Sequence, residues 1–418
     1  MNAGLDGMGM QPLGYPVRTG RRLSLDFPTP ELGPLHRARA TPNDGGEMSE
    51  QPAPSGLSSE RSARRILMAG GTGTIGRAVV AALVARGHEV VCVLRPPVGQ
   101  RAQALAQSSP KAAVQPSQSP APEPAPDEGP TAARPRGPGS LAGAELRYCQ
   151  VTDPASLAEQ GLRNEHFDAI LSCLASRTGA PRDAWAVDHQ ANLNLLHQGK
   201  AAGATQMVLL SAICVQRPRL AFQQAKLAFE AALTDSGLTF SIVRATAFFK
   251  SLAGQIERVR RGKPYLLFEN GQLTACKPIS DRDLAAYLAR CLNDASLHNK
   301  ILPIGGPGPA ITPLEQGEFL FELLGREPSF KQIPVALLKR IVAALGIAGK
   351  LVPPLAAKAE LARIGHYYAT ESMLLLDPAT GRYDAQATPE TGQDTLFDYY
   401  RRVVEGAETA ERGEHAVF

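Results

Sequence analysis

Residues 65–76, RILMAGGTGTIG, constrain the fold of this chain more than any other stretch. The stretch begins with a short apolar run, residues 66–69, typical of a strand buried in a parallel sheet. Glycines follow at positions 70, 73 and 76, and a helical pattern begins directly after them. Glycines let the backbone turn tightly and approach a pyrophosphate, which the free N–H groups of a helix N-terminus bind. The order of strand, glycine-rich turn and helix therefore predicts a dinucleotide-binding domain.

The next part of the chain supports the same interpretation. A second apolar run, residues 89–94, follows at the distance expected for a β-α-β unit. The glycines are spaced Gly-x-x-Gly-x-x-Gly, whereas standard dehydrogenases have Gly-x-Gly-x-x-Gly. This spacing is typical of short-chain dehydrogenases and reductases. We expect Gly70, Gly73 and Gly76 to hold the cofactor pyrophosphate.

The end of the second strand indicates which cofactor is bound. NAD-specific sites have an acidic residue there for the ribose 2′-hydroxyl, whereas an arginine attracts the 2′-phosphate of NADP. This chain has Arg95 at that position, between Leu94 and Pro96. The sequence therefore predicts NADPH as the cofactor. The alternative is that Arg95 is an ordinary solvated surface residue.

The composition is that of an ordinary globular protein and limits its partners. Of 418 residues, 44% are hydrophobic and 20% charged. The 44 basic and 40 acidic residues give a net charge of +4, which is too balanced to indicate nucleic-acid binding. The six cysteines form no Cys-x-x-Cys pair, so we expect free thiols and no metal site. No apolar run is long enough to predict a transmembrane helix.

Three stretches have the composition of disordered or flexible chain. Residues 1–62 are interpreted as a disordered extension, and we hypothesise that Met48 is the true start, so that residues 1–47 are not translated. A transit peptide is the alternative, although such peptides contain few acids and this segment has several. Residues 97–143 are interpreted as a low-complexity surface insertion, and residues 406–418 as a flexible tail.

Between and after these stretches the pattern is that of a doubly wound α/β fold. Further strands are predicted at 145–150, 168–173, 206–211 and 239–243, and helices at 185–202 and 220–235. They place an NADP-binding, parallel Rossmann sheet within residues 63–246. Residues 247–405 are assigned to a smaller C-terminal α/β region that binds substrate, with helices near 247–261, 282–292, 314–324, 336–345 and 356–368.

The residues expected to carry the chemistry depart from the usual pattern. Short-chain reductases have a Ser after the fifth strand and Tyr-x-x-x-Lys on the next helix, where Tyr protonates a carbonyl oxygen. Here Ser211 ends the fifth strand and the helix reads Phe222-Gln-Gln-Ala-Lys226. A phenyl ring neither donates nor accepts a proton, so ketone reduction by the usual mechanism is not expected. Two hypotheses remain: the protein reduces a carbon–carbon double bond, or it senses the cofactor without catalysing a reaction.

Several motifs together resemble one family, the divinyl chlorophyllide a 8-vinyl reductases. The resemblance covers about residues 64–405 apart from 97–143, and its most specific parts are the three late motifs. It implies an atypical short-chain reductase that uses NADPH to convert the 8-vinyl group of divinyl chlorophyllide a or divinyl protochlorophyllide a into ethyl, in chlorophyll or bacteriochlorophyll biosynthesis and hence photosynthesis. The motifs are 70–76, 211–215, 222–226, 248–252, 276–281, 301–307 and 367–373.

The resemblance also implies site residues by position. Lys226 is the catalytic residue and holds the nicotinamide ribose, with Ser211 in the same cofactor site. Further cofactor contacts are implied for Thr72 and Thr74 at the phosphates, Asp153 near the adenine, and Ser172 and Ala175 beside the ribose.

The flat macrocycle of the implied substrate requires an apolar pocket with few polar anchors. Phe248, Phe249 and Lys250 follow the sixth strand, at the mouth of the sheet, and we assign them to substrate binding, although packing is the alternative for the two phenylalanines. Residues 331–366 are basic and apolar, which predicts peripheral membrane contact; a solvated basic face is the alternative.

Three other functions remain open at this stage: an NADP(H)-sensing regulator, an assembly factor of a photosynthetic or respiratory complex on the same fold, and an isoflavone-reductase-like enzyme. The last class also keeps Lys without Tyr but lacks the late motif at residues 367–372. The expected location is the cytoplasm of a photosynthetic bacterium, in part at the membrane; the alternative is the chloroplast, if the N-terminal extension is a transit peptide.

Overall fold

The computed structural model describes residues 63–97, 141–351 and 353–408, within a unit that spans residues 61–418. The predictions for residues 1–62, including the start at Met48, lie outside the described residues. So do most of the predicted insertion 97–143 and all but the first three residues of the predicted tail 406–418.

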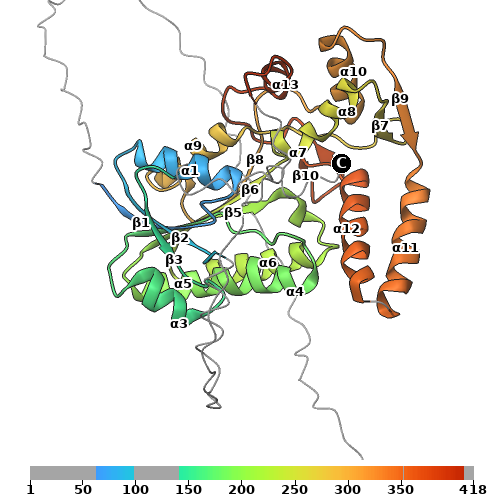
Figure 1. The fold of residues 1–418 in the computed structure, drawn as a ribbon. Coiled ribbons are helices and arrows are strands. Elements are labelled where there is room, and N and C mark those ends of the chain that lie inside the picture. Colours follow the sequence, from blue (N-terminus) through green and yellow to red (C-terminus); the bar gives the residue numbers. More distant parts are fainter. Residues whose placement is uncertain (1–62, 98–140, 352, 409–418) are drawn as a thin grey trace, which may run out of the picture. The chain divides into compact units, whose positions relative to one another are not determined.

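The core of this unit is a seven-stranded parallel sheet (Figure 1). Its order, β3-β2-β1-β4-β5-β6-β8, reverses direction between β1 and β4, which is the arrangement of a doubly wound sheet. The six strands predicted from the sequence are confirmed as β1 (Arg65–Ala69), β2 (Glu89–Leu94), β3 (Glu145–Tyr148), β4 (Ala169–Ser172), β5 (Gln206–Ala212) and β6 (Thr239–Ala245).

The seventh strand, β8 (Lys300–Ile304), was not expected as a strand. It pairs in parallel with β6 at the edge of the sheet. It contains Pro303, which sequence patterns assign to edges or loops because proline cannot donate a ladder hydrogen bond. The preceding helix α9 (Asp281–Arg290) also packs on the sheet, against α1 (Thr74–Val84). The predicted substrate-binding region 247–405 therefore contributes one strand and one helix to the Rossmann layers.

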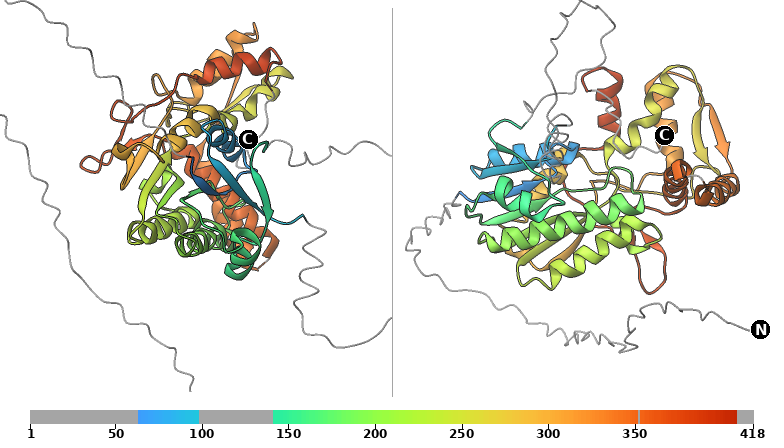
Figure 2. Two further views of the ribbon diagram at one scale, coloured as in Figure 1. Left: turned by 90° about the vertical axis from the view of Figure 1, so that its left-hand side faces the viewer. Right: turned by 60° about the horizontal axis from the view of Figure 1, so that its bottom comes forward.

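Helices cover both faces of the sheet (Figures 1 and 2). On one face, α1 and α9 pack on the strands in a single apolar core. On the other, α5 (Asn192–Ala201) and α6 (Ala221–Thr234) do so in a second core. The predicted helix 185–202 is in fact continuous from α4 (Pro181–Ala184) through a π-helical segment, Trp185–Ala191, into α5. Such wide turns often mark functional positions.

Beyond β6 the chain builds a smaller region over the carboxyl ends of the strands (Figure 1). Its own core joins short helices to a two-stranded parallel sheet of β7 and β9. A pair of helices, α11 and α12, then leads back to the carboxyl edge of the large sheet. The remaining elements are α7 (Phe249–Leu252), α8 (Ile256–Arg260), β7 (Tyr265–Phe268), α10 (Pro313–Leu323), β9 (Phe330–Ile333), α11 (Val335–Leu351), α12 (Pro353–Thr370), β10 (Leu375–Leu376), β11 (Tyr383–Asp384) and α13 (Leu396–Val404).

Candidate functional site

The glycine-rich turn between β1 and α1 is so tight that it excludes side chains at two positions. Gly70 has φ +82°, and a Cβ there would lie 2.6 Å from the backbone carbonyl of Cys173. A Cβ on Gly76 would lie 2.0 Å from the carbonyl oxygen of Gly70. The helix start is therefore packed directly on the turn. Sequence reasoning missed Gly71, whose Cβ would lie 2.3 Å from Sγ of Cys92 on β2.

Gly73, the middle one of the three predicted glycines, has a different role. Gly73 is the N-cap of α1, and a Cβ there would meet the turn only at an ordinary 3.5 Å. Within the described part of the chain, no side chain caps this helix. Thr72 is exposed, and Thr74 is the first residue of α1. The N–H groups at the start of α1 are uncapped, and the glycines of the turn leave room for a ligand beside the backbone. Both features suit the pyrophosphate of a dinucleotide.

Two predicted cofactor residues follow the next two strands of the chain, β2 and β3. Arg95 is exposed directly after β2. Asp153 follows β3 and caps the short helix α3 (Pro154–Ser156), accepting from the N–H of Ala155 at 3.1 Å. Since one oxygen of Asp153 is occupied by the cap, a contact with an adenine would use the other.

The residues predicted beside the ribose, after β4, differ in exposure. Ser172 is fully buried, and its hydroxyl donates to Oδ1 of Asn192 at 2.6 Å. Ala175 is exposed and lines the cavity described below. Only Ala175 thus presents its side chain to a ligand, while Ser172 ties β4 to α5.

Lys226 projects from α6 into the same space and is held by a carboxylate that sequence reasoning missed. Its Nζ lies 2.9 Å from Oδ1 of Asp188, in the π-helical segment. The side chains of Lys226 and Asp188 are only 11% and 1% exposed. The backbone N–H of Ser176 donates to both oxygens of Asp188 at 3.3 Å. The buried carboxylate of Asp188 therefore orients the ammonium group of Lys226. The π-helical segment that carries Asp188 could not be predicted from the sequence.

Ser211, at the end of β5, lines the cavity but points its hydroxyl elsewhere. The hydroxyl donates to Oε1 of buried Glu230 at 2.5 Å. Glu230 in turn forms an ion pair with Arg244 of β6 at 2.5 Å. The serine oxygen is thus engaged inside the layer between sheet and α6.

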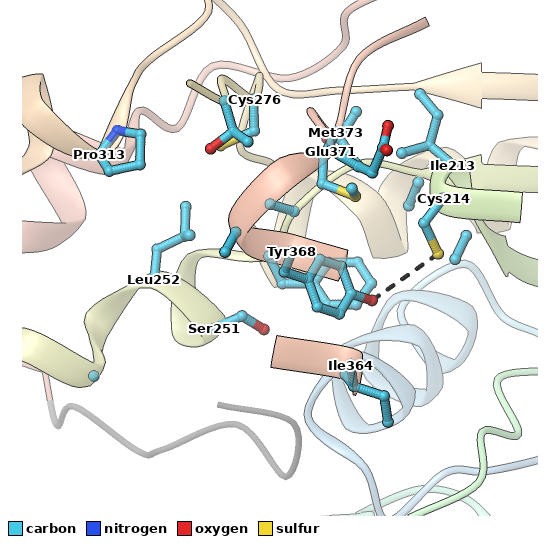
Figure 3. Close-up of a pocket in the computed structure, with 18 of the residues that line it drawn as sticks. Ile213, Cys214, Ser251, Leu252, Cys276, Pro313, Ile364, Tyr368, Glu371 and Met373 are labelled. Atoms are coloured by element: carbon cyan, nitrogen blue, oxygen red, sulfur yellow. Dashed lines mark hydrogen bonds between the residues drawn. The ribbon is translucent and has the colours of Figure 1, made fainter. Parts of the chain in front are cut away.

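The cavity itself opens at the carboxyl ends of β4, β5 and β6 and has a volume of about 330 Å³. Lys226 and Asp188 lie at its sheet end, together with Phe222. From there it runs between the short helices after β6 and the end of α12, as Figure 3 shows. Its walls are mostly apolar, a composition typical of small-molecule sites. The apolar and thiol residues lining it include Cys173, Leu174, Ile213, Cys214, Phe222, Phe248, Leu252, Leu266, Leu273, Cys276, Ile311, Ile364 and Met373.

The three residues predicted to bind substrate after β6 are separated by the structure. Phe248 lines the cavity. Phe249 is 3% exposed and packs on Tyr399 in the core of the smaller region, with ring centroids 5.5 Å apart. Lys250 forms an ion pair with Asp281 at 3.3 Å, away from the cavity. Phe249 and Lys250 point away from the cavity that Phe248 lines, because the chain turns into the helix α7 at Phe249.

A further charged group on the cavity wall is Glu371. Glu371, just after α12, is paired with Arg219 at 2.7 Å and with Arg217 at 3.3 Å. The hydroxyl of Tyr383 donates to the same carboxylate at 2.7 Å. The carboxylate charge is therefore compensated by groups outside the cavity.

The thiols of the cavity behave as apolar groups. Burial raises the pKa of Cys173 and of Cys276 to about 12, so both are protonated at neutral pH. All six cysteines are free thiols. Across residues 63–97, 141–351 and 353–408, no cluster of histidine, cysteine and acidic side chains has the arrangement of a metal site.

Comparisons with known proteins agree with this geometry. The NAD dependent epimerase/dehydratase family model matches residues 66–234. The chain is 43% identical over 414 residues to divinyl chlorophyllide a 8-vinyl-reductase, chloroplastic, of Zea mays, covering 96% of this chain and 95% of that one. The enzyme of the same name from Oryza sativa is 45% identical over 359 residues, covering 84% of this chain and 82% of the other.

More distant similarities extend to other functions on the same fold. The photosystem II assembly factor Ycf39 of Synechocystis is 24% identical over 66% of this chain and 72% of its own. Among solved structures, leucoanthocyanidin reductase with NADPH from Vitis vinifera superposes with a TM-score of 0.52 at 12% identity, over 82% of this chain and 99% of that one. An NADPH-dependent quinone oxidoreductase from Escherichia coli gives 0.51 at 19% identity, over 81% and 99%. These structural likenesses support the fold alone.

Proposed function

The chain belongs to the divinyl chlorophyllide a 8-vinyl-reductase family, and from that premise we propose which cofactor, substrate and residues serve its reaction. It is an oxidoreductase of chlorophyll biosynthesis that uses a nicotinamide cofactor and reduces the 8-vinyl group of a chlorophyllide to ethyl. The finer assignments below rest on the site. The observation that supports them most is an apolar cavity that ends at the buried Lys226–Asp188 pair.

The cofactor proposed is NADPH. Gly70, Gly73 and Gly76 with the start of α1 would hold its pyrophosphate, and Thr72 and Thr74 would add hydrogen bonds. The remaining contacts proposed are Arg95 at the 2′-phosphate, Asp153 near the adenine, and Ser172 and Ala175 beside the ribose, with Ala175 the better exposed of the last two. When bound, the reduced nicotinamide supplies a hydride.

Lys226, at the end of the cavity that lies against the large sheet, is the proposed catalytic residue. Asp188 fixes its ammonium group, so that it binds the nicotinamide ribose in one orientation. Phe222 occupies the position of the usual proton-donating tyrosine and leaves an apolar surface there. Ser211 supports this end of the site through Glu230 rather than through a contact of its own hydroxyl with the ligand. Such a site favours a double bond over a carbonyl, because no alkoxide oxygen has to be protonated.

The substrate proposed is divinyl chlorophyllide a, with divinyl protochlorophyllide a as a second substrate. Apolar walls suit the face of a flat macrocycle, and polar contacts would be confined to its edge. Phe248 remains a proposed contact with the ring. Phe249 and Lys250 would act on substrate binding indirectly, by fixing the smaller region that carries the cavity wall.

Peripheral membrane contact is also part of the proposal. Leu337, Ile341 and Ile347 on α11 are exposed, beside the exposed cations Lys339 and Arg340. Exposed apolar groups with basic neighbours suit an anionic lipid surface. None of the helices in the described ranges is long and apolar enough to cross a membrane. Flotation with anionic vesicles tests this contact; protein that stays at the bottom of the gradient contradicts it.

For the location, we propose the chloroplast, with the bacterial cytoplasm as the alternative. The names of the two reductases from Zea mays and Oryza sativa describe those proteins as chloroplastic. Sequencing the N-terminus of the mature natural protein distinguishes the two. A start inside residues 1–62 other than Met48 or Ser49 supports import and cleavage, whereas a start at Met1 or at Met48 contradicts it.

Turnover with purified protein tests the proposed cofactor and substrate. The protein is mixed with divinyl chlorophyllide a and NADPH, and the pigments are separated by chromatography and weighed by mass spectrometry. We expect the 8-ethyl pigment, a lower rate with NADH, and turnover of divinyl protochlorophyllide a as well. Cofactor binding without any pigment change would instead favour an NADP(H)-sensing regulator or an assembly factor such as the distant Ycf39 relatives.

A further inference from the structure

A reduced double bond needs a proton as well as a hydride, and the usual donor is absent from α6 because Phe222 takes its place. The cavity nevertheless contains a phenol from another part of the chain. Tyr368, near the end of α12, lines the cavity together with Phe222 and Lys226. Figure 3 shows its hydroxyl directed toward Cys214, which follows β5. A tyrosine is thus restored to the site by a helix about 140 residues later in the chain.

The hydroxyl of Tyr368 is weakly engaged compared with those of other tyrosines nearby. Its hydrogen bond to Sγ of Cys214 is long, 4.0 Å, and a thiol is a poor acceptor. The adjacent Tyr367 donates to the backbone carbonyl of Cys214 at 2.8 Å, and Tyr383 donates to Glu371 at 2.7 Å. Tyr265, which also lines the cavity, is 3% exposed and belongs to the core of the smaller region. Among these four, Tyr368 is best able to give its proton to a ligand.

Tyr368 also lies at the sheet end of the cavity, where the hydride arrives. Cys214 connects the two sides: it contacts the hydroxyl of Tyr368, and the charge of Lys226 acts on its thiol. The other titratable groups on the cavity wall are Asp188 and Glu371, both compensated by cations, and the buried thiols Cys173 and Cys276. Burial raises the pKa of Tyr368 well above 10, so the phenol is protonated at neutral pH and is an acid rather than a base.

We propose that Tyr368 is the proton donor of the vinyl reduction, an assignment that rests on the proposed function. The outer vinyl carbon of the substrate accepts the hydride, and a C–H bond forms there as the π bond breaks. The electron pair moves to the inner carbon and the conjugated ring. The O–H bond of Tyr368 then breaks, its proton forms the second C–H bond at the inner carbon, and water reprotonates the phenolate after product release.

Tyr368→Phe is the first test, because it removes the proton and keeps the ring. General acid catalysis contributes about 100-fold or more, so kcat should fall by about that factor. The dissociation constants of NADPH and of divinyl chlorophyllide a, measured by fluorescence quenching, should stay within about threefold, since no strong hydrogen bond is lost. The matched control is Tyr287→Phe, a buried phenol on α9 outside the cavity, which should keep wild-type turnover.

A second variant keeps the test decisive if the first one folds poorly. Tyr368→difluorotyrosine preserves the shape of the side chain and lowers the pKa of its phenol. Wild-type kcat should show no alkaline limb up to pH 9, because burial keeps Tyr368 protonated. The fluorinated variant should show such a limb, which a purely structural tyrosine would not produce.

The outcomes separate this proposal from the proposed function. If wild-type protein converts the pigment and Tyr368→Phe does so within threefold of its rate, Tyr368 is not the donor. An unchanged pH profile of the fluorinated variant overturns the assignment in the same way. If the wild-type protein itself does not convert the pigment, the proposed function fails, whatever the variants do.

Discussion

The proposed cofactor site is built from backbone and one ion pair, whereas the proposed substrate site is built from apolar side chains. The first comprises the glycine turn, the start of α1 and the Lys226–Asp188 pair. The second is a wall of side chains from the short helices after β6 and from α12. The difference matches two ligand chemistries, a charged dinucleotide beside a flat apolar ring.

The two sites also differ in how well they tolerate substitutions. A backbone site depends on the absence of side chains, so a single methyl group at the wrong place blocks it. An apolar wall tolerates substitutions that conserve volume, because its contacts are many and individually weak. The polar groups Lys226 and Tyr368 on the cavity wall are the exceptions, and they are the residues proposed to carry the chemistry.

The largest effect is expected at the glycine turn. In Gly76→Ala the new Cβ would lie 2.0 Å from the carbonyl oxygen of Gly70. The turn must shift, at a cost of about 3 kcal/mol, which lowers both the melting temperature and NADPH affinity. Gly73→Ala is the matched control, since its Cβ meets the turn at 3.5 Å. It should melt within a few degrees of the wild type while NADPH binding, followed by fluorescence, weakens; wild-type affinity in Gly73→Ala would break the comparison.

Lys226→Met should lower kcat by about 100-fold, because the ribose loses its positioning cation. The variant also leaves the carboxylate of Asp188 buried without its cation, which destabilises the fold by about 3 kcal/mol. Adding Asp188→Asn to Lys226→Met should recover much of that stability, measured by thermal unfolding, but no turnover. Wild-type turnover in the single variant would remove Lys226 from the proposed mechanism.

A smaller effect is expected from Arg95→Ala. If this exposed arginine meets the 2′-phosphate, its loss should weaken NADPH binding about 10-fold, the worth of one charge-assisted pair. NADH lacks that phosphate, so its dissociation constant should not change. Equal losses for both cofactors would show that Arg95 does not discriminate between them.

The smallest effect on activity is expected at Arg147, a buried residue of the edge strand β3. Its guanidinium donates to Glu145 and Glu165, and these hydrogen bonds lower the pKa of both carboxyls below their usual range. The folded protein therefore binds fewer protons than the unfolded chain near pH 4. The stabilisation is present above the ordinary carboxyl pKa of 4.5 and is lost as the pH falls through the lowered values.

Arg147→Met should thus lower the melting temperature at pH 7 by about 5 °C and flatten its fall between pH 5 and pH 3. Turnover at the growth temperature should match the wild type, because Arg147 and the other residues of β3 are not part of the cavity wall. An Arg147→Met protein that is stable but inactive would show that Arg147 takes part in the reaction and does not only stabilise the fold.

The sequence predicted those parts of the fold and of the site that depend on local patterns. The strands β1 to β6 and the glycine turn follow from local apolar runs and glycine spacing, which the structure confirms. Lys226 was found because its spacing on α6 is local too. Its partner Asp188 was missed, since a π-helical turn has no reliable local pattern.

The cavity was less predictable because its residues come together only in the folded chain. Phe248, proposed as a substrate contact, lies on the cavity wall, but its neighbours Phe249 and Lys250 turn away into a core and an ion pair. Tyr368 belongs to a motif noticed in the sequence, yet nothing in that motif predicts that it lines the same cavity as Phe222. Long-range packing, not propensity, decides such positions.

The central claim is that a hydride from the nicotinamide cofactor and a proton from Tyr368 are added to one vinyl group. Turnover in D₂O with unlabelled NADPH tests it most directly, with the pigment mass as the readout. The account predicts an 8-ethyl product heavier than the substrate by one hydrogen and one deuterium, because the phenol of Tyr368 exchanges with solvent and the hydride does not. A product carrying two solvent deuteriums, or no product at all, would contradict it.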